Sequence, residues 1–105
     1  MSYYDTDGTP ISLEDWSKGL NDLSKKRVAY TPLPDGKIVS TVWLGLDPRF
    51  GMGKPLIFQT MVFPSEQNFS ELDCRRYNTL VEARVGHIDI VQEWMNKQGE
   101  PTDSA

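Results

Sequence analysis

The sequence predicts an α+β fold, in which an antiparallel sheet of about four strands has two helices packed on it, in the order β-α-β-β-β-β-α. Three observations predict it. Two segments begin with helix-capping patterns, a stretch between them has the pattern of a β-hairpin, and the run PLIFQTMVF is apolar on both strand faces. A chain of 105 residues suits one domain. We expect residues 1–98 to form it and residues 99–105 to be a flexible polar tail.

The first helix is expected after the short extended segment YYDTDGTPI. Ser12 can cap this helix, and Asp15 stands at its third position as an acidic form of the capping box. Trp16, Leu20 and Leu23 follow at the spacing i, i+4, i+7, which predicts that all three lie on one buried face of the helix.

The segment RVAYTPLPDGKIVSTVWLGL has the strongest hairpin signal in the chain. A turn is predicted between two β-branched runs. Pro34 has a preset φ, Asp35 has a side chain that can accept a backbone hydrogen bond, and Gly36 tolerates a positive φ. The next strand, PLIFQTMVF, has the pattern of a central strand, or of one that a helix or a partner subunit covers on its second face. The polar loop PSEQNFSELD then leads to a short strand, CRRY.

The last helix begins at a capping box, Thr79-Leu80-Val81-Glu82, and ends before Gly99 and Pro101. Placing its residues at 100° steps gives one apolar arc, with His87 in its middle and acidic residues opposite. The arc consists of Leu80, Ala83, Ile90, Val91 and Trp94, with Ile88 and Met95 at its edge.

Composition excludes several classes of function. The net charge of −4 disfavours general binding to nucleic acids, which requires a cationic surface. A single cysteine and a single histidine exclude an intrachain disulfide and leave too few ligands for a typical zinc site, so we predict no metal and no cofactor. The apolar runs are shorter than a membrane span, and we expect a cytoplasmic protein of a bacterial host.

The loop GLDPRFGMGKP is the first candidate for chemistry because two glycines precede a lysine. A P-loop needs a glycine five residues before its Gly-Lys pair, then Ser or Thr and a helix. Here Pro48 and Pro55 occupy those positions, and a strand follows. We interpret residues 47–54 as a strand connection, with anion or nucleotide binding through Arg49 and Lys54 as the alternative.

His87 and Cys74 are the second candidates. A buried imidazole needs hydrogen-bond partners, and it also titrates near neutral pH, so His87 is either a core histidine or an acid–base group. Partners for a core histidine would be a backbone carbonyl or a polar sheet residue, namely Thr41, Gln59, Thr60 or Tyr77. An enzyme that used Cys74 as nucleophile and His87 as base would require the strand and the helix to bring the two together.

Aromatic and apolar residues outside the predicted core could form an interaction surface. Tyr3 and Tyr4 near the N-terminus are candidates for a partner surface, or they pad a sheet edge. Phe50 and Met52 in the glycine loop are further candidates.

The segments YYDTDGTPISLEDW, VSTVWLGLD, PLIFQTMVF and RRYNTLVEARVGH resemble a family of short, functionally uncharacterised proteins of bacteriophages and prophage-carrying bacteria. Together these segments span nearly the whole chain. Family members often have a histidine and a glutamate where this chain has Pro48 and Gln59, so chemistry that used those two side chains would be missing here. The resemblance implies phage-type accessory biology and no particular substrate.

We therefore predict a small non-catalytic accessory protein of phage type that binds a host or phage protein, or itself. Modulation or inhibition of a host defence system is one specific form of this prediction. The alternatives are a binder of nucleotides or other small ligands that uses the 47–54 loop, and an enzyme that uses Cys74 and His87.

Overall fold

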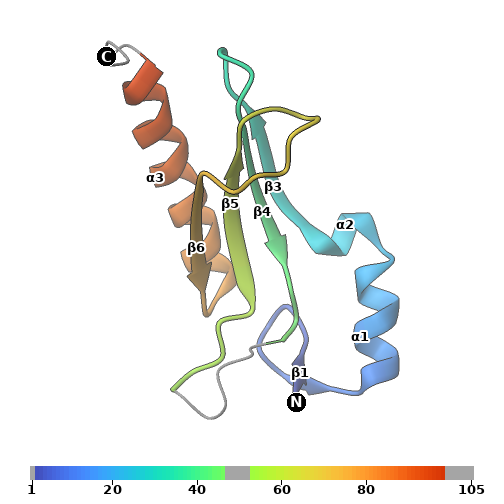
Figure 1. Cartoon of the computed structure of the whole chain (residues 1–105). Coiled ribbons are helices and arrows are strands. Elements are labelled where there is room, and N and C mark those ends of the chain that lie inside the picture. Colours follow the sequence, from blue (N-terminus) through green and yellow to red (C-terminus); the bar gives the residue numbers. More distant parts are fainter. Residues whose placement is uncertain (1, 47–52, 99–105) are drawn as a thin grey trace.

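The computed structural model describes residues 2–46 and 53–98, and its architecture is α+β, as predicted (Figure 1). Residues 47–52 and the expected tail, 99–105, lie outside the described residues. The elements are β1 (Tyr3–Tyr4), β2 (Pro10–Ile11), α1 (Leu13–Leu20), α2 (Leu23–Lys26), β3 (Arg27–Pro32), β4 (Ile38–Trp43), β5 (Phe58–Phe63), β6 (Asp73–Tyr77) and α3 (Leu80–Gln98).

Strands β3 to β6 form an antiparallel sheet in the order β3-β4-β5-β6, so each strand pairs with its neighbour in the sequence. The predicted hairpin turn joins β3 and β4. Gly36 has a φ of 97°, and the Asp35 carboxylate accepts a hydrogen bond from the Lys37 N–H at 3.0 Å. The turn therefore uses the residues that the sequence indicated, for the expected physical reasons.

Helix α3 packs on one face of this sheet, and the loop between β5 and β6 crosses the other face (Figure 1). The side chains beneath α3 form two apolar clusters with a polar band between them. The first cluster contains Trp43, Ile57, Phe58 and Ala83, and the second contains Leu33, Val39, Val62 and Ile90. The band contains Thr41 in the middle of β4, Thr60 opposite it in β5, and His87 in α3.

The N-terminal elements pack at one end of the sheet, beside Trp43 (Figure 1). Helix α1 begins as predicted, with the Ser12 hydroxyl accepting a hydrogen bond from the Asp15 N–H. A Cβ at Gly19 would lie 2.7 Å from the Trp43 ring, so the glycine allows the helix to approach this ring closely.

The prediction that Leu23 continues the buried face of the first helix was wrong. Helix α1 ends at Leu20, and Asp22 caps the separate turn α2 by accepting a hydrogen bond from the Ser24 N–H. This break changes the direction of the chain, and Leu23 is 60% exposed.

Candidate functional site

His87 lies on the inner face of α3 and is 5% exposed. Its Nδ1 is 2.7 Å from the Thr41 hydroxyl of β4, and its Nε2 is 2.8 Å from the Thr31 hydroxyl of β3. The Thr41 hydroxyl also hydrogen-bonds the Thr60 hydroxyl of β5. One helix residue and one threonine from each of three strands therefore form a continuous hydrogen-bond network beneath α3.

This network engages both ring nitrogens of His87. A neutral imidazole has one N–H donor and one acceptor nitrogen, so one nitrogen donates to a threonine while the other accepts from the second threonine. Burial lowers the pKa of His87, which favours this neutral form. Because neither nitrogen is left for a substrate proton, the geometry favours a structural histidine over an acid–base group.

Sequence reasoning named Thr41 among the possible partners of His87 but missed Thr31. Thr31 stands opposite Val39 in the β3–β4 register, on the face that α3 covers. Counting alternate residues outward from the Pro-Asp-Gly turn would have placed Thr31 on that face.

Tyr77 of β6 lies beneath the same part of α3. Its hydroxyl is fully buried and has no hydrogen-bond partner. Among the described residues, it is the one buried side-chain polar atom in this situation. Burial raises the pKa of Tyr77. A Cβ at Gly86 would lie 2.2 to 2.4 Å from the Tyr77 ring and hydroxyl, so Gly86 makes room for this side chain.

Cys74 lies on the opposite face of the sheet from His87. Its neighbours in β6 face α3: the Asp73 carboxylate accepts a hydrogen bond from the Trp94 indole, and the Arg75 guanidinium is 2.6 Å from the Glu93 carboxylate. Since side chains alternate along a strand, Cys74 points away from α3. Burial, together with the charge of Glu71, raises the pKa of the Cys74 thiol. The sheet thus separates the two residues that a cysteine–histidine mechanism would need to bring together.

Of the predicted loop residues, Arg49, Phe50 and Met52 lie outside the described residues. Lys54 is exposed and lines a groove of about 450 Å³ that also contains Asp7 and the first residues of α3. Lys54 is the one cation among the described lining residues of this groove, and Asp7 offsets its charge.

The first turn of α3 at this groove already has a carboxylate partner. The Glu82 carboxylate accepts hydrogen bonds from the Thr79 N–H and hydroxyl, and the Thr79 hydroxyl accepts one from the Glu82 N–H. This is the capping box that the sequence predicted. Its carboxylate would compete with a bound anion for the start of the helix.

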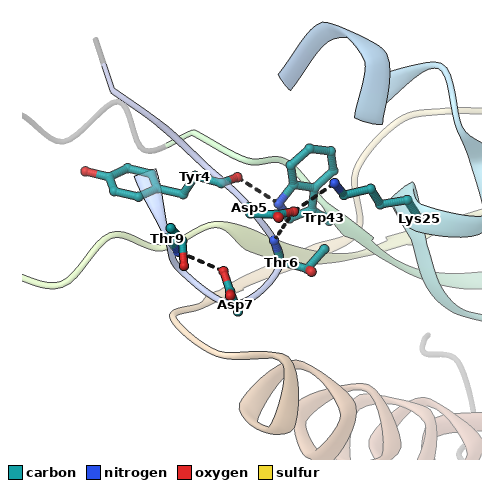
Figure 2. Close-up of polar contacts among 7 residues, drawn as sticks. All are labelled: Tyr4, Asp5, Thr6, Asp7, Thr9, Lys25 and Trp43. Carbon is teal, nitrogen blue, oxygen red and sulfur yellow. Dashed lines mark hydrogen bonds and ion pairs between the residues drawn. The ribbon is translucent and has the colours of Figure 1, made fainter. Parts of the chain in front are cut away.

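Tyr3 and Tyr4, which the sequence analysis placed outside the predicted core, are both half-buried. The Tyr3 ring packs on Trp16 with a centroid distance of 4.7 Å, and Tyr4 packs against the first apolar cluster. The Trp43 indole N–H donates to the Tyr4 carbonyl at 3.2 Å (Figure 2). These contacts fit the interpretation that the two tyrosines cover an edge of a sheet.

The turn after Tyr4 is held by its own carboxylates (Figure 2). Asp5 accepts a hydrogen bond from the Thr6 N–H and pairs with the Lys25 ammonium at 2.8 Å, and the Asp7 carboxylate accepts a hydrogen bond from the Thr9 N–H. The Lys25 ammonium pairs with Asp5 and also lies 5.3 Å from the Trp43 ring centroid. These contacts tie the N-terminal turn to α2 and to the end of β4, which gives it a structural role.

The outer face of α3 carries a row of exposed apolar side chains, which we call the outer stripe. Val81 is 69% exposed, Val85 53%, Ile88 60% and Met95 44%, and the exposed Gln92 completes the row. Sequence reasoning placed Ile88 and Met95 at the edge of the buried arc, and the structure exposes both. The spacing of the stripe was the signal that could have found it.

A second apolar surface lies on the sheet face opposite α3. Tyr30, Ile38 and Phe63 line a groove of about 510 Å³ there with Phe69, which stacks edge-to-face on Phe63 at 5.6 Å. The loop that carries Phe69 therefore covers part of the second apolar face that the sequence predicted for β5.

Within residues 2–46 and 53–98, no cluster of three or more histidine, cysteine, aspartate or glutamate side chains could hold a metal ion. In the same part of the chain, no helix has the length and apolar character needed to cross a membrane. Comparison with protein-family models, curated proteins and solved structures gives no match to this chain.

Proposed function

We propose that this chain is a small non-catalytic accessory protein that acts by binding another protein through the outer stripe of α3. The single observation that carries the proposal is the exposure of Val81, Val85, Ile88 and Met95 in one row on a helix that is already packed on its other side. Apolar side chains gathered in one exposed row are typical of an interaction site, whereas isolated exposed apolar residues are common on any protein.

The geometry of the reactive side chains supports this proposal over an enzyme. Both nitrogens of His87 are engaged with threonines, and Cys74 lies on the other side of the sheet with a raised pKa. A nucleophilic cysteine needs a base within reach or a lowered pKa, and Cys74 has neither from His87.

The resemblance to phage and prophage proteins gives the proposal its biological setting. We propose that the partner is a host or phage protein, or a second copy of this chain. Modulation of a host defence system is the specific form to test first, by comparing phage plating on defence-carrying hosts that express the wild type or Ile88→Glu. Higher plating with the wild type alone would support it, and equal plating would contradict it.

The direct test is affinity capture from infected host cells with three tagged proteins: the wild type, Ile88→Glu and Leu23→Glu. Leu23 is the matched control, because it is equally exposed at 60% but lies on α2. We expect a bound protein, whether foreign or a second copy, that the wild type and Leu23→Glu retain and Ile88→Glu loses. Capture that is the same for all three proteins would contradict the proposal.

A further inference from the structure

We infer that the outer stripe of α3 binds the outer stripe of a second copy, so that two α3 helices pair in parallel. This inference rests on the proposed function and names its partner. It follows from three properties of the stripe: its spacing, its one polar position and the charges beside it.

The spacing of the stripe is that of a coiled coil. Its members, Val81, Val85, Ile88, Gln92 and Met95, are separated by steps of 4, 3, 4 and 3 residues. This gives d-a-d-a-d heptad positions with an average repeat of 3.5 residues, the repeat that keeps a seam facing a neighbouring helix. Residues that pack on the sheet follow a separate row, which includes Ala83, Gly86, His87 and Ile90.

Gln92 favours the parallel arrangement. In a parallel pair each a position faces the same a position of the other helix, so Gln92 would meet Gln92 of the partner subunit, and two amides can hydrogen-bond each other. In an antiparallel pair a positions face d positions. Gln92 would then meet an apolar d residue of the partner subunit, such as Val81 or Ile88, and its amide would have no partner in the seam.

The charges that flank the stripe favour the same arrangement. Arg84 stands at a g position and Asp89 at the following e position. A parallel pair brings Arg84 next to Asp89 of the partner subunit, twice by symmetry. An antiparallel pair would place Glu82 next to Asp89 of the partner subunit, where like charges repel.

The helix is already formed and oriented for this contact. Ala83 and Ile90 hold its inner face on the sheet and are fully buried, so pairing would not have to fold the helix. Figure 1 shows α3 on one side of the molecule and α1 and α2 on the other. The exposed fractions of Val81, Val85 and Ile88 show that the outer stripe is accessible to solvent. A short seam on a fixed helix avoids the ordering cost that makes short isolated coiled coils weak.

The first test measures the mass of the full-length protein in solution against concentration, by sedimentation equilibrium. We expect a concentration-dependent dimer whose dissociation constant rises at least about 100-fold in Ile88→Glu and stays unchanged in Leu23→Glu. A dimer that Ile88→Glu leaves intact would overturn the inference. Far-ultraviolet circular dichroism checks that each variant is folded.

The second test reads the direction of the helices without weakening the seam. In a Cys74→Ser background, Gln92→Cys should give a disulfide-linked dimer on mild oxidation, since a parallel pair brings the two copies of position 92 together. The control, Leu23→Cys in the same background, should stay uncrosslinked. A wild-type dimer that does not crosslink through position 92 would overturn the parallel arrangement.

The third test uses the flanking charges. Arg84→Glu should weaken the dimer about threefold to tenfold, and the double variant Arg84→Glu with Asp89→Arg should restore it. No rescue would contradict the proposed pairing of these two residues. A protein that stays monomeric at every concentration, yet binds another protein through Ile88, would overturn the homodimer and leave the proposed function standing.

Discussion

The inner and outer faces of α3 differ in a way that its composition does not suggest. Ile88 and Ile90 are the same residue type two positions apart, yet Ile88 is 60% exposed and Ile90 is fully buried. The inner face also contains the small residues Ala83 and Gly86 and the polar His87, whereas the outer stripe consists of valine, isoleucine, glutamine and methionine side chains.

The comparison shows that the shape of the side chains decides which face of α3 packs on the sheet. Gly86 allows the helix to approach the Tyr77 ring, and His87 reaches the threonines of the strands. A helix that is apolar on two sides is usually covered on two sides. The sheet covers the inner side, and in the proposed dimer a second copy would cover the outer side.

The largest expected effect comes from Ile90→Ala. This substitution opens a cavity in the second apolar cluster, beside Val39 and Val62. We expect the free energy of unfolding to fall by about 2–5 kcal/mol, as measured by urea denaturation at pH 7. A loss below about 1 kcal/mol would show that the inner face is not the tightly packed side.

Gly86→Ala should also destabilise the protein, although alanine is normally the better helix former by about 1 kcal/mol. The added methyl group would collide with the Tyr77 ring, and we expect a net loss of about 1–3 kcal/mol in the free energy of unfolding. The control is the same substitution in a Tyr77→Ala background, where the ring is gone. There Gly86→Ala should be neutral or stabilising, and an equal loss in both backgrounds would contradict the proposed collision.

The buried histidine predicts a pH dependence of stability. Burial lowers the pKa of His87 in the folded protein below its ordinary value of 6.5, so below that pH the unfolded chain binds more protons. The contribution of His87 to the free energy of unfolding is therefore fully present above about pH 6.5 and is lost as the pH falls. This one group changes the free energy of unfolding by at most about 1.4 kcal/mol per pH unit.

The measurement is the free energy of unfolding between about pH 7.5 and pH 5, for the wild type and for His87→Gln. Glutamine keeps a donor and an acceptor near Thr31 and Thr41 but does not titrate. The slope over this range should be smaller in the variant. Identical slopes would show that His87 does not control stability in this pH range. Asp5 and Asp22 do not account for the slope, because their lowered pKa values place their titration at lower pH.

The smallest expected effect comes from Ile88→Ala, the counterpart of Ile90→Ala. Because Ile88 is mostly exposed in the single chain, its truncation should change the free energy of unfolding by less than about 0.5 kcal/mol when measured at low protein concentration. At high concentration the wild type should gain stability from dimer formation and the variant should gain less. A large loss at low concentration would contradict the exposure of this side chain.

Local signals in the sequence determined much of this protein. The caps at Ser12 and Thr79 and the turn at Asp35 and Gly36 depend on residues within three or four positions of one another, and the structure confirms each of them. The α+β class and the antiparallel sheet follow, because short connections and alternating strands leave few other arrangements.

The tertiary structure alone decided how distant residues meet. Strand register brought Thr31 to His87, although 56 positions separate them in the chain, and the side-chain alternation of β6 turned Cys74 away from the same histidine. The sequence contains the regular spacing of the outer stripe, but only the packing of α3 on the sheet showed which of the two apolar faces of α3 is exposed. Periodicity defines the faces of a helix, whereas the shape and hydrogen bonds of the opposing sheet decide which face is buried.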